Sequence, residues 1–108
     1  MIIHYYNADN WSKPSVHYWN ATGASEGQTT WPGKEMEKET GNWYVYTIDG
    51  ATASSLLFVD GSNTNAKTSD LSQKEGEWWY NTTLLFFVGM LVARFYSSIM
   101  NYLKKYYY

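Results

Sequence analysis

The feature that most constrains the fold is a series of short β-prone runs, each followed by turn residues. Residues 43–48 and 55–59 are rich in aromatic and β-branched side chains, and an Asp-Gly pair closes each run. Three other runs predict strands: 2–6, 15–20 and 77–80. Strands this short, with turn signals between them, are typical of a β-sandwich. We therefore predict an all-β fold, a small immunoglobulin-like β-sandwich, with an atypical apolar tail at the C-terminal end.

Three polar segments separate these runs. Residues 21–30 are polar and contain Gly, which predicts a loop. The alternating charges of 34–40 would allow one helical turn, but we interpret this segment as an exposed loop between strands. The segment 62–66 is rich in Asn, Ser and Thr, and we expect a turn-rich loop there.

A cluster of planar side chains falls on one of the predicted strands. Alternate residues of a strand point to the same side, so His17 and Trp19 share one face while Val16 and Tyr18 share the other. We assign Tyr18 and Val16 to the interior. Trp31 follows in the next loop, where a Pro-Gly pair would fix the backbone. Exposed rings in this arrangement make a stacking platform that suits the apolar face of a sugar or a nucleobase.

The charge distribution argues against a nucleic acid. Residues 1–83 contain five Lys or Arg and all ten Asp and Glu, a balance of −5, whereas residues 84–108 contain three basic residues, a balance of +3. A protein that binds a phosphate backbone needs clustered basic side chains. The aromatic part of this chain is acidic, so we expect no nucleic-acid partner.

The sequence offers little for catalysis or metal binding. There is no Cys, hence no disulfide framework, thiolate metal site or cysteine nucleophile. His4 and His17 fall on different predicted strands without a metal-ligand pattern, and no convergent carboxylate pair stands out. We therefore expect no enzyme activity, no metal and no cofactor. We also expect no signal peptide, because the chain enters a β-prone run at once; an exported protein would contain this chain as a module.

The character of the sequence changes at residue 84. Residues 84–93 are ten apolar residues, and Arg94 follows them. We divide the chain into a module at 1–83 and an apolar and aromatic tail at 84–108. Three interpretations of the tail stay open: a weak membrane anchor or interfacial helix, a short element packed on the domain edge, or a segment that is not native coding sequence. A span of about 20 residues would put Arg94 near mid-bilayer, so any membrane contact would come only through 84–108.

Several blocks of the sequence, in order and spacing, resemble the starch-binding carbohydrate-binding modules of families 25 and 26, with family 26 the closer. The resemblance covers about residues 1–81. The blocks that carry it are Ile3-His4-Tyr5-Tyr6, Asn10-Trp11, Ser15-Val16-His17-Tyr18-Trp19, Trp31-Pro32-Gly33-Lys34-Glu35-Met36, Gly41-Asn42-Trp43-Tyr44-Val45-Tyr46-Thr47-Ile48, Leu57-Phe58-Val59-Asp60-Gly61 and Lys67-Thr68-Ser69-Asp70-Leu71.

The resemblance implies a non-catalytic β-sandwich that binds α-1,4-glucans such as starch and maltooligosaccharides. The parent protein would be extracellular or at the cell surface, with a covalently linked amylase-type catalytic domain. The resemblance also places His17 and Trp31 in the sugar site, and Trp19 shares the strand face of His17. Lys67 stands where these families usually have a Gln that hydrogen-bonds a sugar hydroxyl; Lys can donate but cannot accept. The alternative is a β-sandwich protein-interaction or cell-surface domain that uses the same aromatic patch.

Overall fold

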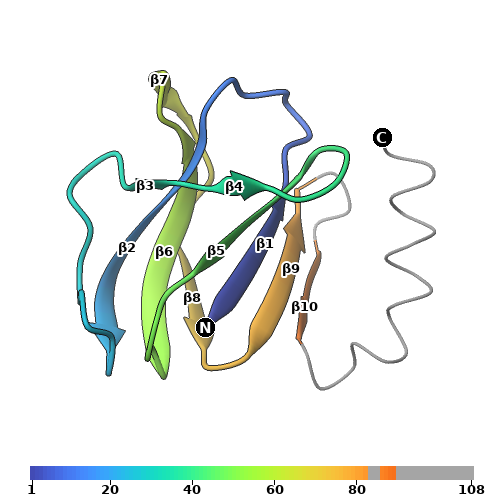
Figure 1. The fold of residues 1–108 in the computed structure, drawn as a ribbon. Helices are drawn as coiled ribbons and strands as arrows, with labels where there is room; N and C mark the ends of the chain where they lie inside the picture. Colours follow the sequence, from blue (N-terminus) through green and yellow to red (C-terminus); the bar gives the residue numbers. More distant parts are fainter. Residues whose placement is uncertain (83–85, 90–108) are drawn as a thin grey trace.

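Ten strands in two sheets make up the described part of the chain (Figure 1). The computed structural model describes residues 1–82 and the backbone of residues 86–89. The strands are β1 Ile2–Tyr6, β2 Pro14–Thr22, β3 Lys34–Glu35, β4 Glu37–Lys38, β5 Trp43–Thr47, β6 Ala53–Asp60, β7 Asn63–Lys67, β8 Leu71–Lys74, β9 Glu77–Asn81 and β10 Phe86–Gly89. In the described ranges every regular element is a strand, so the predicted all-β class is confirmed.

The two sheets face each other as the layers of a sandwich (Figure 1). Sheet I has the order β10-β9-β1-β5-β4, and sheet II the order β3-β2-β6-β7, with β8 also paired to β6. The β1–β9 pairing is parallel and the other pairings are antiparallel. The predicted β-sandwich is therefore confirmed.

The core between the sheets follows the alternation of the strands. Val16 and Tyr18 of β2 are buried, as predicted, and Phe58 of β6 is fully buried with them. Tyr5 of β1 stacks on Phe58 with 4.4 Å between ring centroids, which joins the two sheets through aromatic packing. Because these residues point inward, His17 and Trp19 must point away from the core.

The segment 34–40 is not a simple loop, which corrects our prediction. β3 pairs with β2 in sheet II, and β4 pairs with β5 in sheet I, so the chain crosses from one sheet to the other between them (Figure 1). Met36 lies between β3 and β4 and is only 4% exposed. The charged residues on either side are exposed, as predicted. One buried apolar side chain thus anchors a charged segment whose pattern alone indicated a loop.

The prediction of a turn-rich loop over 62–66 holds only for Ser62, which lies in a turn, and is wrong for the rest, since β7 occupies Asn63–Lys67. β7 lies at an edge of sheet II, where its polar side chains remain exposed. Backbone pairing with β6 overrides the turn preference of Asn and Ser here, because β propensity depends on context.

The C-terminal segment is described only in part. The backbone of β10 pairs antiparallel with β9 and extends sheet I beyond residue 83. The remainder of 84–108 lies outside the described residues, so our three interpretations of this tail stay predictions. The division at residue 83 therefore stays a prediction. In the described ranges, no helix has the length and apolar character needed to cross a bilayer.

Candidate functional site

Three rings gather on the outer face of sheet II, and we name His17, Trp19 and Trp31 the aromatic platform. The rings of His17 and Trp19 lie 5.4 Å apart, centroid to centroid, with 29° between their planes. The Trp31 ring lies 5.1 Å from His17 at 83°. The rings therefore form an angled surface rather than a flat row.

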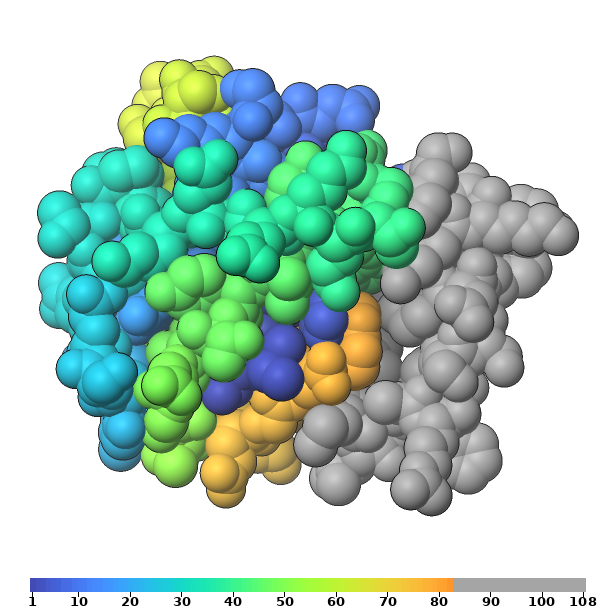
Figure 2. Space-filling model, viewed as in Figure 1, coloured from blue at the N-terminus to red at the C-terminus, as the bar shows by residue number. Residues whose placement is uncertain are grey.

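Trp31 is the most exposed of the three, with 43% of its surface accessible. It belongs to the long connection between β2 and β3, which forms the left flank of the molecule in Figure 2 (cyan to teal). Gly33 donates its backbone N–H to the Thr30 carbonyl at 2.7 Å and closes the turn that carries Trp31. Gly33 has φ +102°, and a Cβ there would lie 2.1 Å from the Val16 carbonyl oxygen. Only Gly can occupy this position, so the turn is held tightly against β2.

His17 is fixed by a buried neighbour. Its Nδ1 lies 2.6 Å from the Thr29 hydroxyl, and Thr29 is 3% exposed. The Tyr18 backbone N–H also donates to this hydroxyl at 3.1 Å, and the Thr29 N–H donates to the Tyr18 carbonyl at 2.9 Å. Thr29 therefore sets the orientation of the imidazole. In residues 1–82, Nε2 of His17 has no hydrogen-bond partner.

Partial burial favours the neutral form of the His17 imidazole. Burial lowers the pKa of His17 below its ordinary 6.5, and the nearby Asp70 carboxylate opposes this shift. A neutral imidazole with one bonded nitrogen can offer either a donor or an acceptor at the other, depending on its tautomer. A sugar or water hydroxyl can pair with either tautomer, because a hydroxyl both donates and accepts hydrogen bonds.

Lys67 reaches the platform from the opposite edge of the sheet. Its Nζ lies 5.7 Å from the centroid of the Trp31 ring, within the range of a cation–π contact. The register supports this position. Lys67 pairs with Val59 of β6, which lies two residues from Leu57 on the same face of the strand, and Leu57 pairs with His17. Leu57 is only 4% exposed, so an apolar base lies beside the rings.

The structure thus brings together all four residues that the sequence singled out: His17, Trp19, Trp31 and Lys67. Sequence reasoning missed Thr29 and the electrostatic role of Asp70. Thr29 follows a polar loop with no local signal, and it meets His17 only because the chain from 21 to 29 folds back along β2.

A second cluster lies on the outer face of sheet I, around His4. Its Nδ1 and Nε2 each lie 2.6 Å from a carboxylate oxygen, of Glu39 and Glu77 respectively, and its ring stacks on Trp79 at 4.7 Å. His4 is 6% exposed, and the cluster ties β1 and β9 to the segment before β5. In the described part of the chain, no three His, Cys, Asp or Glu side chains are placed to hold a metal ion.

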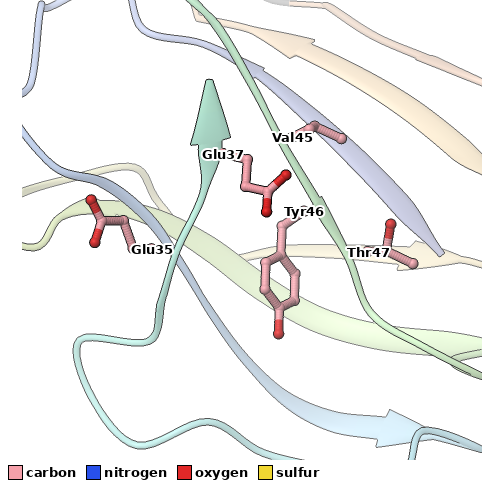
Figure 3. Close-up of a pocket in the computed structure, with 5 residues that line it drawn as sticks. All are labelled: Glu35, Glu37, Val45, Tyr46 and Thr47. Atoms are coloured by element: carbon pink, nitrogen blue, oxygen red, sulfur yellow. The ribbon is translucent and has the colours of Figure 1, made fainter. Parts of the chain in front are cut away.

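A hollow of about 260 Å³ lies away from the platform, where the chain crosses between the sheets. Figure 3 shows it lined by Glu35, Glu37, Val45, Tyr46 and Thr47. Both glutamates are exposed, and the hollow offers one aromatic ring rather than a set. This hollow therefore offers less surface for stacking than the platform does.

A two-sheet sandwich with angled rings on an exposed sheet face is the architecture expected of a carbohydrate-binding β-sandwich module. The family model described as Starch-binding module 26 matches residues 3–73. The chain belongs to this family.

Two kinds of relative agree with this assignment. The starch-binding module CBM26 of a Bacillus halodurans amylase is 26% identical, with a TM-score of 0.63 over 75% of this chain and 85% of that one. The same module in complex with maltose gives 26% identity and a TM-score of 0.62, over 75% and 90% of the two chains. An α-amylase of Butyrivibrio fibrisolvens is 28% identical over 69 residues, which are 63% of this chain and 7% of the amylase. The chain therefore corresponds to a small part of that amylase.

Proposed function

We propose that this module binds α-1,4-glucans, including starch and maltooligosaccharides, on the aromatic platform and catalyses no reaction. The observation that carries the proposal is the angled arrangement of the three rings, 5.1 and 5.4 Å apart, in a chain of the starch-binding family. A related module of the same family has been solved with maltose bound.

Stacking on rings supplies the main attraction. Glucose carries C–H groups on its faces and hydroxyls around its edge, so a ring that covers one face removes apolar surface from water. Each platform ring that covers roughly 50–100 Å² contributes on the order of 1–3 kcal/mol. Two such rings, offset by the costs of association, give dissociation constants from about 10 μM to 1 mM.

The angle between the rings favours a curved ligand. The α-1,4 linkage turns each glucose relative to the last, whereas the β-1,4 linkage of cellulose keeps the sugars in a flat ribbon. The 83° between the planes of His17 and Trp31 fits two faces that turn. A flat chain would leave one of the rings uncovered.

The polar groups beside the rings fit the edge of the sugar. Nε2 of His17, which has no hydrogen-bond partner within residues 1–82, and Nζ of Lys67 both lie at the platform. Both groups can hydrogen-bond sugar hydroxyls. Such bonds contribute about 0.5–1.5 kcal/mol each and orient the chain more than they tighten it.

The biological role that follows is tethering. We propose that a catalytic domain covalently linked to this module acts on starch while the module raises its local concentration, outside the cell or at its surface. The α-amylase relative, of which the matched part is a small fraction, supports this arrangement.

Calorimetric titration of the full chain with maltoheptaose, beside cellohexaose, tests the proposal. We expect heat and micromolar-to-millimolar binding for maltoheptaose and none for cellohexaose. Equal binding of both sugars would refute the curvature argument. No heat from the folded chain at millimolar maltoheptaose would refute glucan binding and favour a protein-interaction domain.

A further inference from the structure

A shallow groove of about 410 Å³ runs on from the platform along sheet II. The register makes the two continuous, because Trp19 of β2 pairs with Ser55 of β6, and Ser55 pairs with Ser72 of β8. Both serines line the groove. The groove therefore begins beside Trp19, at the opposite end of the platform from Lys67 (strands in Figure 1).

An irregularity in β2 accounts for the groove. The register between β2 and β6 shifts between Trp19 and Thr22, and Asn20 adopts φ +52°. Such bulges bend a strand and redirect side chains, and they occur often beside binding sites. Asn20 lines the groove at the point where the regular pairing stops.

The side chains that line the groove are mostly small and polar, whereas those of the platform are large and aromatic. On the outer face it consists of Ala53, Ser55, Ser72 and Lys74, which alternate with inward residues along β6 and β8. No ion pair formed within residues 1–82 involves Lys74. Hydroxyls, an amide and an ammonium group can bond the hydroxyl edge of a sugar, but they offer no ring on which to stack.

We propose that this groove is an extension subsite, which binds the α-glucan chain where it leaves the platform past Trp19. The inference rests on the proposed function, and it makes the module selective for chains longer than maltose. Its affinity would come from hydrogen bonds to Asn20, Ser55, Ser72 and Lys74 rather than from stacking.

The test compares maltose with maltoheptaose by calorimetry on the full chain. We define the preference as the association constant for maltoheptaose divided by that for maltose. A seven-unit chain can place six different two-unit segments on the platform, so a site limited to the platform predicts a preference of about sixfold on statistics alone. One or two further hydrogen bonds raise the expected preference to roughly 20- to 60-fold.

Ser72→Ile should block the groove without disturbing the strand, since Ser72 is exposed and Ile favours strands. We expect it to return the preference to about sixfold with maltose affinity unchanged. Thr64→Ile, on the exposed edge strand β7, is the matched control and should leave both affinities unchanged. Lys74→Ala, with Lys38→Ala as its control, provides a second variant that removes a donor and should cost about three- to tenfold for maltoheptaose alone.

The outcomes separate the two proposals. A native chain that binds neither sugar would overturn the proposed function and the extension with it. Native binding of both sugars with a preference near sixfold, unaffected by Ser72→Ile and Lys74→Ala, would overturn the extension alone. Loss of maltose binding in a folded Ser72→Ile variant would also overturn it, since the groove would then belong to the platform.

Discussion

Removing the Trp31 ring is the sharpest test of the platform. Trp31 is 43% exposed, and the turn that carries it is closed by the backbone bond between Gly33 and Thr30. Trp31→Ala should therefore remove the stacking surface and leave the fold intact. The lost cation–π contact with Lys67 adds only about 0.5–1 kcal/mol at an exposed site.

The size of the effect follows from the exposed area. An aromatic side chain presents about 150–250 Å², so the 43% exposed fraction leaves on the order of 65–110 Å² for a sugar to cover. If glucose covers roughly 50–100 Å² of it, the loss is about 1.3–2.5 kcal/mol at 25 cal/mol/Å². The dissociation constant for maltoheptaose should then rise about 10- to 70-fold.

Calorimetry with maltoheptaose, beside thermal melts of the same samples, measures this. Trp31→Phe should retain part of the affinity, because it keeps a smaller ring. Trp79→Phe, on the other sheet, serves as the control and should bind as the native chain does. A folded Trp31→Ala variant within twofold of the native affinity would refute the reasoning, since the most exposed ring would then not contact the sugar.

Three further predictions follow from the same site. Gly33→Ala should lower the melting temperature by about 5–20 °C, because a Cβ would meet the Val16 carbonyl at a positive φ; an unchanged melt would contradict the geometry. Lys67→Met should weaken maltoheptaose binding about two- to tenfold by calorimetry while it preserves side-chain length, and native affinity in that variant would remove Lys67 from the site. Burial lowers the pKa of His17 in the folded chain, so on acidification the imidazole is protonated in the unfolded chain before it is protonated in the folded one. The free energy of unfolding should therefore fall as the pH drops below about 6.5. Between pH 8 and pH 5, the urea midpoint of unfolding should fall less steeply in the His17→Gln variant than in the native chain. Equal slopes of the midpoint against pH would contradict the prediction.

Local patterns predicted the regular strands well. The run at 2–6 coincides with β1, and those at 15–20, 43–48, 55–59 and 77–80 fall within a residue or two of β2, β5, β6 and β9. These strands carry the alternating apolar side chains of the core, which is a strong local signal. β3, β4, β7 and β8 were not predicted from local patterns. They are short and mostly polar on the outside, and they form because a neighbouring strand offers backbone partners.

The platform was predictable because two of its rings lie two residues apart on one strand. That spacing alone puts His17 and Trp19 on one face. Trp31 was inferred from the Pro-Gly turn, and Lys67 from the family resemblance. The contact between Lys67 and Trp31 depends on β7 lying along β6, which no local pattern indicated.

The sequence by itself determined the fold class, the inward and outward faces of β2 and the identity of the rings, because strand alternation is a local property. Only the tertiary structure decided the angle between those rings, the Thr29 hydroxyl on His17 and the groove past Trp19. These features depend on the pairing of distant segments and on a shift in register. Both are set by long-range backbone hydrogen bonds and packing rather than by the residues' own preferences.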